Sequence, residues 1–177
     1  MIIRKIVNAA FYIIVAFYMV FMIHLLFRFN RILNFDREIL RNYNLVPFKT
    51  ILQYAEGRTS ALRDSAFSNI FGNIILFIPC GLYIQVLKKD KALGKSLLIV
   101  LVAPIVVEVI QFVFGLGACD IDDVLLNFCG GAIGILVYKL LRMFKTEQRA
   151  KTAVTVISLA GGLPAIYWLL FRFGFRL

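Results

Sequence analysis

The sequence predicts an all-α membrane protein: a bundle of about five transmembrane helices, with a further helix lying at the interface in the first outer loop. Hydrophobic residues make up 61% and charged residues 17% of the 177 residues, and mean hydropathy is +0.86. Soluble domains have about 45–50% apolar and about 25% charged residues. The apolar residues fall into runs of about 20, the length that crosses a bilayer as a helix. The length allows one domain, residues 1–177.

The charge and cysteine content exclude several kinds of site. The net charge of +10 does not indicate nucleic-acid binding, because Lys and Arg cluster in loops between apolar runs, where they set topology and meet anionic headgroups. Cys80, Cys119 and Cys129 lack CxxC spacing, and His24 is the single histidine, so a metal–thiolate site is not indicated. We therefore expect no metal, no cofactor and no nucleic-acid partner.

The first predicted span is Ile6–Phe27, with basic residues on both sides. It is too long for a signal peptide and lacks a small-residue cleavage site, so we interpret it as a transmembrane helix. The long first loop, residues 28–66, begins with Phe29–Leu40, whose apolar residues recur at helical spacing. This segment is predicted to be the interfacial helix. Pro47 disfavours helix at Val46 and predicts a turn there.

The second and third spans each contain a feature that is unfavourable in hydrocarbon. Phe67–Leu87 contains Pro79, and we expect an interruption and a bend there, since proline removes a backbone hydrogen bond and clashes with the preceding turn. Ser96–Phe114 contains Glu108. A bare carboxylate is costly in a membrane, so Glu108 is expected to be protonated, paired or at a wet inner face.

The fourth and fifth spans are rich in glycine. Val124–Leu141 contains Gly130 and Gly134, a GxxxG pattern that predicts close packing against the third span. Ala153–Phe171 contains two adjacent glycines and Pro164 near its middle, and these are expected to break the helix.

Orientation follows from the short loops. The loops at residues 88–95 and 139–151 are strongly basic, whereas the short loop at residues 115–121 has no Lys or Arg. Short loops decide orientation best, and basic loops stay inside. The N-terminus is therefore predicted to be cytoplasmic. The polar residues of the spans then gather in the outer half of the membrane, below the long first loop.

These polar residues are the candidates for function. Glu108 and Gln111 are three apart and share a helix face. Asp120, Asp123 and Asn127 keep close to one stripe of the next helix, and Asp122 is expected to point elsewhere. The candidate pocket residues are Asn73, Glu108, Gln111, Asp120, Asp123 and Asn127.

Glu108 is expected to form the floor of an outward-opening polar pocket, beside Asn73 and Asn127. Arg58 and Arg63 of the first loop are candidates for balancing its charge. A purely structural interpretation also stands. In it, the aspartates cap the fourth helix at its positive end, and Glu108 bonds to backbone groups that a proline has freed.

Three motifs, in order, resemble the VanZ-like family: NLVPF at Asn44–Phe48, GNIILFIPCG at Gly72–Gly81, and VEVIQFVFGLGACDIDDVLLNFCGG at Val107–Gly131. The likeness covers residues 44–141. The family pattern has an Asn before the LFIP run, Glu and Gln three apart, and two acids three apart followed by Asn, and the six candidate residues match it. Asp122 is an additional acid outside that pattern. The resemblance implies an integral protein of the bacterial membrane, linked for some members to lower susceptibility to glycopeptides such as teicoplanin.

Three functions remain open at this point. A binding factor would hold a lipid-linked cell-wall precursor, a lipid headgroup or the acyl tail of a glycopeptide, and we favour it because the sequence has no clear nucleophile. A membrane-embedded enzyme would act on a lipid headgroup, with Glu108, Asp120 and Asp123 as bases or as ligands of magnesium or calcium, while Asn73 and Asn127 would orient the substrate. A transporter would use broken helices beside polar residues, but no inverted repeat is found.

Overall fold

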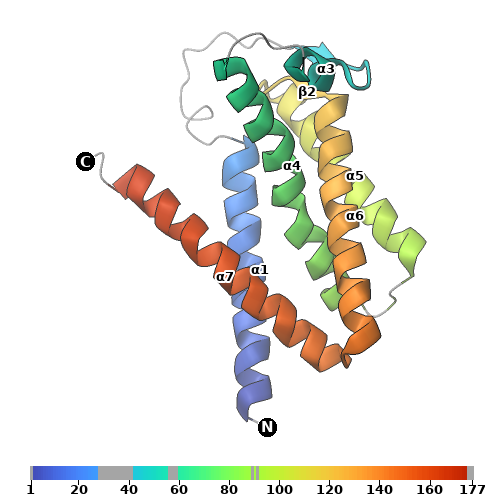
Figure 1. Ribbon diagram of the computed structural model, residues 1–177, viewed down its shortest axis with the longest axis vertical. Helices are drawn as coiled ribbons and strands as arrows, with labels where there is room; N and C mark the ends of the chain where they lie inside the picture. The colour runs from blue at the N-terminus through green and yellow to red at the C-terminus, as the bar shows by residue number, and fades with distance from the viewer. Residues whose placement is uncertain (1, 28–41, 56–59, 89, 91, 175–177) are drawn as a thin grey trace. The chain divides into compact units, whose positions relative to one another are not determined.

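The computed structural model describes residues 2–27, 42–55, 60–88, 90 and 92–174, and it describes side-chain surroundings for these residues except 54–55, 60–66, 68 and 163–174. Six helices and two short strands make up the described chain (Figure 1). The helices are α1 (Ile2–Phe27), α3 (Lys49–Ala55), α4 (Ser60–Leu87), α5 (Leu93–Val113), α6 (Ile121–Phe144) and α7 (Glu147–Gly174), and the strands are β1 (Tyr43–Asn44) and β2 (Cys119–Asp120). The all-α class is confirmed. The predicted interfacial helix falls outside the described residues.

Four of the described helices are long and apolar enough to cross a membrane: α1, the Asn69–Leu87 part of α4, α5 and α6. The predicted fifth span lies within α7, which is one continuous helix, so the predicted break at Pro164 is wrong. The predicted interruption at Pro79 is also wrong, because α4 is helical from Ser60 to Leu87. A proline deletes one bond of the helical ladder, and in both helices the turns on either side of it maintain the helix.

The chain divides into two compact units, one of residues 1–22 with 138–177 and the other of residues 23–137. In the first unit, aromatic side chains of α1 form part of the core. Phe11 is fully buried, and the Tyr18 hydroxyl donates to the Met22 sulfur at 3.3 Å. The Lys151 ammonium of α7 lies 4.6 Å from the centre of the Phe11 ring. Burial lowers the pKa of Lys151, and the charge of Arg4 acts in the same direction.

The second unit contains α4, α5 and most of α6, and α5 shows why its environment is a membrane. Its exposed face carries apolar residues such as Leu98, Val102 and Val109, whereas its buried face includes Glu108 with Pro104. A helix in water has the opposite arrangement, with its polar residues outward. Apolar residues facing out and a carboxylate facing in suit a helix surrounded by lipid.

Glycines bring α4 and α6 into backbone contact. A Cβ atom built on Gly130 would lie 2.1 Å from the Ile74 carbonyl oxygen, and one on Gly134 would lie 2.1 Å from that of Ile78. The predicted close packing is therefore present, but its predicted partner, the third span, is wrong: these two glycines face α4. A GxxxG pattern indicates that a neighbour is close without specifying which helix it is. The α5 contact is made by Gly131, which packs against Val100.

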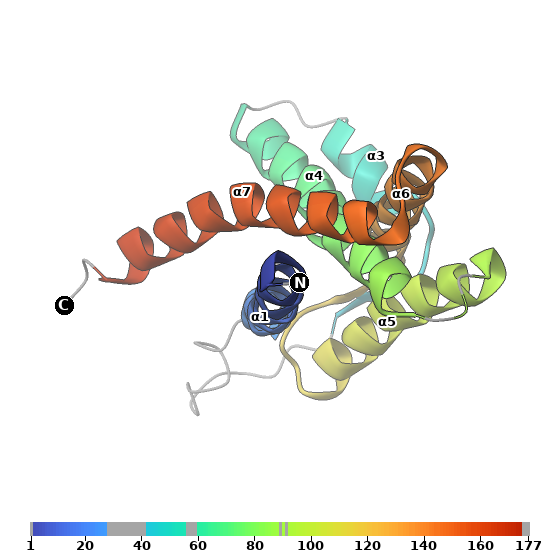
Figure 2. The same cartoon turned by 90° about the horizontal axis from the view of Figure 1, so that it is seen from below.

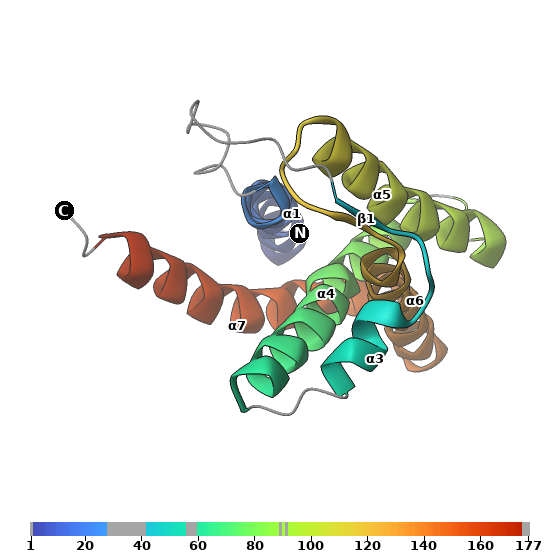
Figure 3. The ribbon, with the colours of Figure 1, turned by 90° about the horizontal axis from the view of Figure 1, so that it is seen from above.

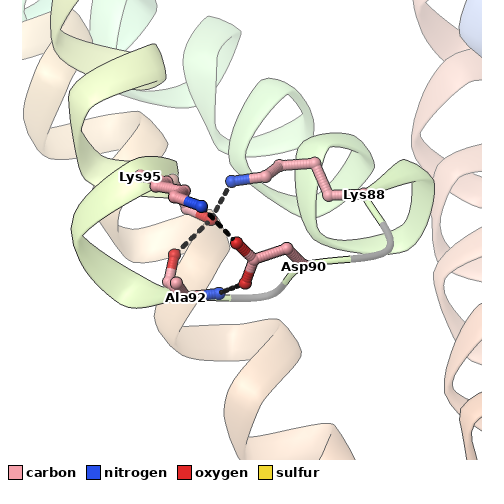
Figure 4. Close-up of polar contacts among 5 residues, drawn as sticks. Lys88, Asp90, Ala92 and Lys95 are labelled. Carbon is pink, nitrogen blue, oxygen red and sulfur yellow. Dashed lines mark hydrogen bonds and ion pairs between the residues drawn. The ribbon is translucent and has the colours of Figure 1, made fainter.

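At one end of this unit α4 leads into α5 through a short basic loop (Figure 2). The Asp90 carboxylate accepts hydrogen bonds from the Lys95 ammonium at 2.6 Å and from the Ala92 N–H at 3.0 Å, and the Lys88 ammonium donates to the Ser96 hydroxyl at 3.3 Å (Figure 4). The hydrogen bond from Lys95 is the main reason why the pKa of Asp90 lies below its ordinary value. These contacts hold the start of α5.

At the other end of the unit, β1 and α3 lie across the ends of the helices (Figure 3). β1 pairs in parallel with β2, with Tyr43 opposite Cys119 and Asn44 opposite Asp120. The Cys119 N–H donates to the Asn42 carbonyl at 3.0 Å, which is the hydrogen bond that a parallel pair of Tyr43 with Cys119 makes. The first loop is thus joined to the segment that precedes α6, where the candidate residues lie.

Candidate functional site

The start of α6 is held by the side chain of Asp120. This residue directly precedes the helix, and its carboxylate accepts the N–H of Asp122 at 2.9 Å, which is the bond that an N-cap residue makes. The same carboxylate accepts hydrogen bonds from the Asn44 amide at 3.1 Å and from the Thr50 hydroxyl at 2.6 Å. The capping role that the sequence left open is therefore present at Asp120. The carboxylate also connects α6 to the first loop.

Asp122 was expected to point away from the other candidate residues, and this prediction is wrong. Asp122 is fully buried, and its carboxylate accepts the N–H groups of Phe48 at 2.5 Å, Thr50 at 2.8 Å and Ile51 at 3.2 Å. These N–H groups lie at the start of α3, so Asp122 of one helix caps another. Phe48 has a φ of 65°, a conformation that costs a non-glycine residue about 1–2 kcal/mol. The Asp122 bonds compensate for this cost.

Glu108 lies near the end of α5 with 3% of its surface exposed, and it accepts the N–H of Asp120 at 2.9 Å. It therefore faces the interior, as predicted, but this partner is the backbone at the start of α6, not one freed by a proline. Asp120 and Asp123 lie near enough to act on its charge. Burial raises the pKa of the nearby Cys119 thiol, and the charges of Glu108 and Asp120 act in the same direction. Both carboxylates therefore lie near enough to Cys119 to act on its thiol.

The remaining candidates divide between two places. The Asn73 amide of α4 donates to the Asp123 carboxylate of α6 at 2.7 Å, which joins the second and fourth predicted spans. Asn127 is 1% exposed, and its side-chain oxygen has no hydrogen-bond partner in the described part of the chain. Gln111 instead donates to the Leu26 carbonyl in the last turn of α1 at 2.8 Å. Gln111 therefore holds α1 and does not join the acids.

Sequence reasoning missed two groups of this network. Thr50 was not singled out, although its hydroxyl donates to Asp120 while also accepting from Asn44 at 3.0 Å. Asp122 was set aside as an additional acid. The available signal was the first motif, Asn44–Phe48, because the structure shows that its Asn44 donates to Asp120 and that its Phe48 N–H donates to Asp122. Arg58 and Arg63, proposed to balance Glu108, lie outside the described side chains.

The chemistry open to this arrangement is hydrogen-bond acceptance and acid–base catalysis. Among the described residues, no group of three or more His, Cys, Asp or Glu side chains has a geometry that could hold a metal ion. The suggestion that Glu108, Asp120 and Asp123 bind a cation together therefore has no geometric support. The hydrogen bonds identified at Glu108 and Asp120 come from neutral N–H and O–H groups.

The comparisons with known proteins agree with the motifs. The family model described as VanZ/LLP1 matches residues 9–142. Protein VanZ of Enterococcus faecium is 32% identical over 135 residues, a match that covers 76% of this chain and 82% of that protein. No solved structure matches the chain. With a family model over most of its length and a relative at this identity, the chain belongs to the VanZ/LLP1 family.

Proposed function

We propose that this membrane protein lowers susceptibility to lipophilic glycopeptides such as teicoplanin by binding a lipid-linked cell-wall precursor, a lipid headgroup or the drug's acyl tail. Membership of the VanZ/LLP1 family and the apolar helices support the class of protein. The binding role rests on one observation above all. Glu108 and Asn127 are polar, almost fully buried and close to the end of apolar helices, and the Asn127 oxygen has no partner among the described residues.

Burying these two polar side chains costs free energy unless a ligand forms hydrogen bonds with them. A buried acceptor without a partner costs about 1–3 kcal/mol. Ionisable residues within membrane helices usually have a function. Asp120 and Asp122 have clear structural duties as caps. Glu108, whose identified bond comes from a single backbone N–H, retains capacity to accept more. We therefore propose Glu108 as the floor of the binding pocket and Asn127 as part of its wall.

We further propose that the N-terminus is cytoplasmic and the acidic end of the helices faces outward. The basic loop between α4 and α5 supports this orientation, since basic short loops stay inside. An outward site would meet the drug and the lipid-linked precursors on the same side of the membrane.

The test is drug susceptibility in a teicoplanin-susceptible host that expresses the protein. Expression should raise the minimal inhibitory concentration of teicoplanin more than that of a glycopeptide without an acyl tail. Glu108→Gln keeps shape and hydrogen bonding but removes charge, so it should reach the membrane, fold and lose the effect. Asp90→Asn, at the other end of the helices, is the matched control and should keep it. Equal protection against both drugs, or full activity in Glu108→Gln, would contradict the proposal.

A second candidate is an enzyme that acts on a lipid headgroup. The proximity of Glu108, Asp120 and Asp123 supports it, because paired carboxylates can transfer protons in both directions. Purified protein would be incubated with a total lipid extract and the lipids compared by mass spectrometry. A headgroup converted by the wild type and left intact by folded Glu108→Gln would favour the enzyme. An unchanged lipid profile together with drug protection would favour binding.

A further inference from the structure

The segment from Tyr43 to Leu52 exposes a large amount of apolar surface for its length. Five large apolar side chains in it are 57 to 71% exposed, and we call them the loop patch: Tyr43, Leu45, Val46, Phe48 and Leu52. Proteins in water rarely expose so many neighbouring apolar groups. Where such a patch occurs, it usually contacts a membrane, a ligand or another protein.

The backbone that carries the loop patch is fastened to α6. The buried Asp122 carboxylate accepts the N–H groups of Phe48 at 2.5 Å, Thr50 at 2.8 Å and Ile51 at 3.2 Å. Because these three bonds fix the inner side of the segment, the patch side chains cannot turn inward unless the bonds break. The patch therefore keeps its outward position and needs a surrounding that accepts apolar groups.

The same bonds place the segment at the edge of the membrane. Asp122 is the second residue of α6, which is long and apolar enough to span a membrane from Ile121 to Phe144. The first turn of a spanning helix lies near the boundary between the hydrocarbon and the headgroups. The backbone groups bonded to Asp122 lie within 3.2 Å of its carboxylate, so they are at the same depth.

The exposed side of α3 separates apolar from polar residues. Phe48 and Leu52 are one turn apart on one stripe, and the Leu52 N–H donates to the Phe48 carbonyl at 2.8 Å. Lys49 and Gln53, which are also exposed, each follow by one position, about 100° further round the helix. An apolar stripe beside a polar stripe is typical of a helix that lies along a membrane surface.

The neighbouring helices also expose aromatic side chains at this end of the unit (Figure 1). α3 packs against α4, in which the exposed rings of Phe67 and Phe71 have centres 4.2 Å apart. Phe114, directly after α5, is exposed as well. Aromatic residues are enriched where membrane helices meet the interface. The loop patch thus continues an apolar surface that the helix ends already present to lipid.

We propose that the loop patch inserts into the headgroup and upper acyl region of the membrane leaflet at this end of the helices. The segment from Tyr43 to Leu52 is then a membrane-surface element, and its bonds to Asp122 hold the start of α6 at the level of the headgroups. This inference goes beyond the proposed function and depends neither on it nor on which side of the membrane the leaflet faces. It concerns a different segment from the interfacial helix predicted at residues 29–40.

A partner protein is the competing occupant of the loop patch. Lipid fits better because it already surrounds the helices at this depth, so a partner would first have to displace it. The two stripes of α3 also fit a boundary between lipid and water, since Phe48 and Leu52 face one phase while Lys49 and Gln53 face the other.

The test measures whether a fluorescent label on the loop patch is reached from lipid or from water. Full-length protein with Cys80, Cys119 and Cys129 replaced by alanine would carry one bimane-labelled cysteine, introduced by Leu52→Cys or by the matched control Gln53→Cys. The protein would be placed in vesicles of phosphatidylcholine and phosphatidylglycerol. Brominated phosphatidylcholine quenches the label from the acyl region, and iodide quenches it from water.

Brominated lipid should quench the label at Leu52→Cys several-fold more than the label at Gln53→Cys, and iodide should show the reverse order. Equal quenching of the two labels by brominated lipid, or stronger quenching at Gln53→Cys, would overturn the proposal. In that case strong iodide quenching at Leu52→Cys would indicate a water-facing patch open to a partner protein. Protection of the Leu52→Cys label from both quenchers would indicate that protein covers the patch, and would overturn the proposal equally.

A second position keeps the test decisive if Leu52→Cys does not fold. Leu45→Cys lies in the extended part of the segment, where the native side chain is 63% exposed and a label can be accommodated. Thermal unfolding in detergent would establish that each labelled protein is folded. A folded Leu45→Cys protein should show the same preference for brominated lipid over iodide, and the opposite preference would refute insertion of the loop patch.

Discussion

Replacing Gly130 by alanine tests whether the backbone contact between α4 and α6 holds the second unit together. The new Cβ would lie 2.1 Å from the Ile74 carbonyl oxygen, about 1.3 Å short of the 3.4 Å at which ordinary contact begins. Both groups belong to helical backbones, so no change of rotamer can relieve the overlap. The helices must move apart or bend, and every contact along the interface then loosens.

The magnitude follows from two opposing effects. Overpacking a well-packed interior costs about 1–3 kcal/mol and occasionally more, and a clash between backbones belongs at the upper end. Alanine also favours helix over glycine by about 1 kcal/mol. The net loss of unfolding free energy should be about 2 kcal/mol, which lowers the melting temperature of a chain of this size by roughly 4–8 °C.

The assay is thermal unfolding in detergent, with Gly72→Ala as the matched control. Gly72 also lies in α4, but nothing lies within 4 Å of its built Cβ, so alanine there should raise the stability by up to about 1 kcal/mol. The two glycine-to-alanine changes should therefore shift the melting temperature in opposite directions. A Gly130→Ala protein that melts at or above the wild type would refute the contact.

Three further predictions concern the ends of the helices. Asp122→Ala leaves three backbone N–H groups without their acceptor, so the free energy of unfolding should fall by about 1–3 kcal/mol. Proteolysis within residues 42–55 should become faster. An unchanged cleavage rate would argue against the cap. In a protein with Cys80 and Cys129 replaced by alanine, alkylation of Cys119 should require a higher pH than alkylation of a free thiol, because the pKa of Cys119 is raised. Glu108→Gln should then lower the midpoint of the pH profile. An unshifted midpoint would mean that the charge of Glu108 does not affect the Cys119 thiol. A cysteine at Ser60 should label from outside intact cells and one at Ala92 should not, and the reverse pattern would invert the proposed orientation.

The apolar spans were predictable because a bilayer imposes length and hydropathy on each helix separately. The four helices that satisfy those criteria correspond to the first four predicted spans. The burial of Glu108 was predictable for the same reason, since a carboxylate in a span cannot face lipid. Local rules misled at Pro79, because a proline disfavours helix locally while the turns on both sides of it maintain α4.

What the sequence could not supply was the pairing of distant groups. Asp122 lies off the stripe of its own helix, and only the docking of α3 more than 70 residues earlier explains its burial. The two-residue strands are too short to produce a pattern of alternation. Gly130 and Gly134 predict a close neighbour, but the choice of α4 over α5 depends on how three helices pack together.

The glycine contacts between α4 and α6 also restrict how the proposed lipid ligand would reach the cluster of Glu108, Asp120 and Asp123. Backbone atoms meet at Gly130, again at Gly134, and once more where Gly81 meets Gly131. No acyl chain fits between surfaces that have no room for a methyl group. The proposed lipid would therefore approach along a flank of α5, or its headgroup would enter from the end where α3 lies. A photo-crosslinking lipid should accordingly label residues of α5 that border the cluster and should leave the glycine faces of α4 and α6 unlabelled.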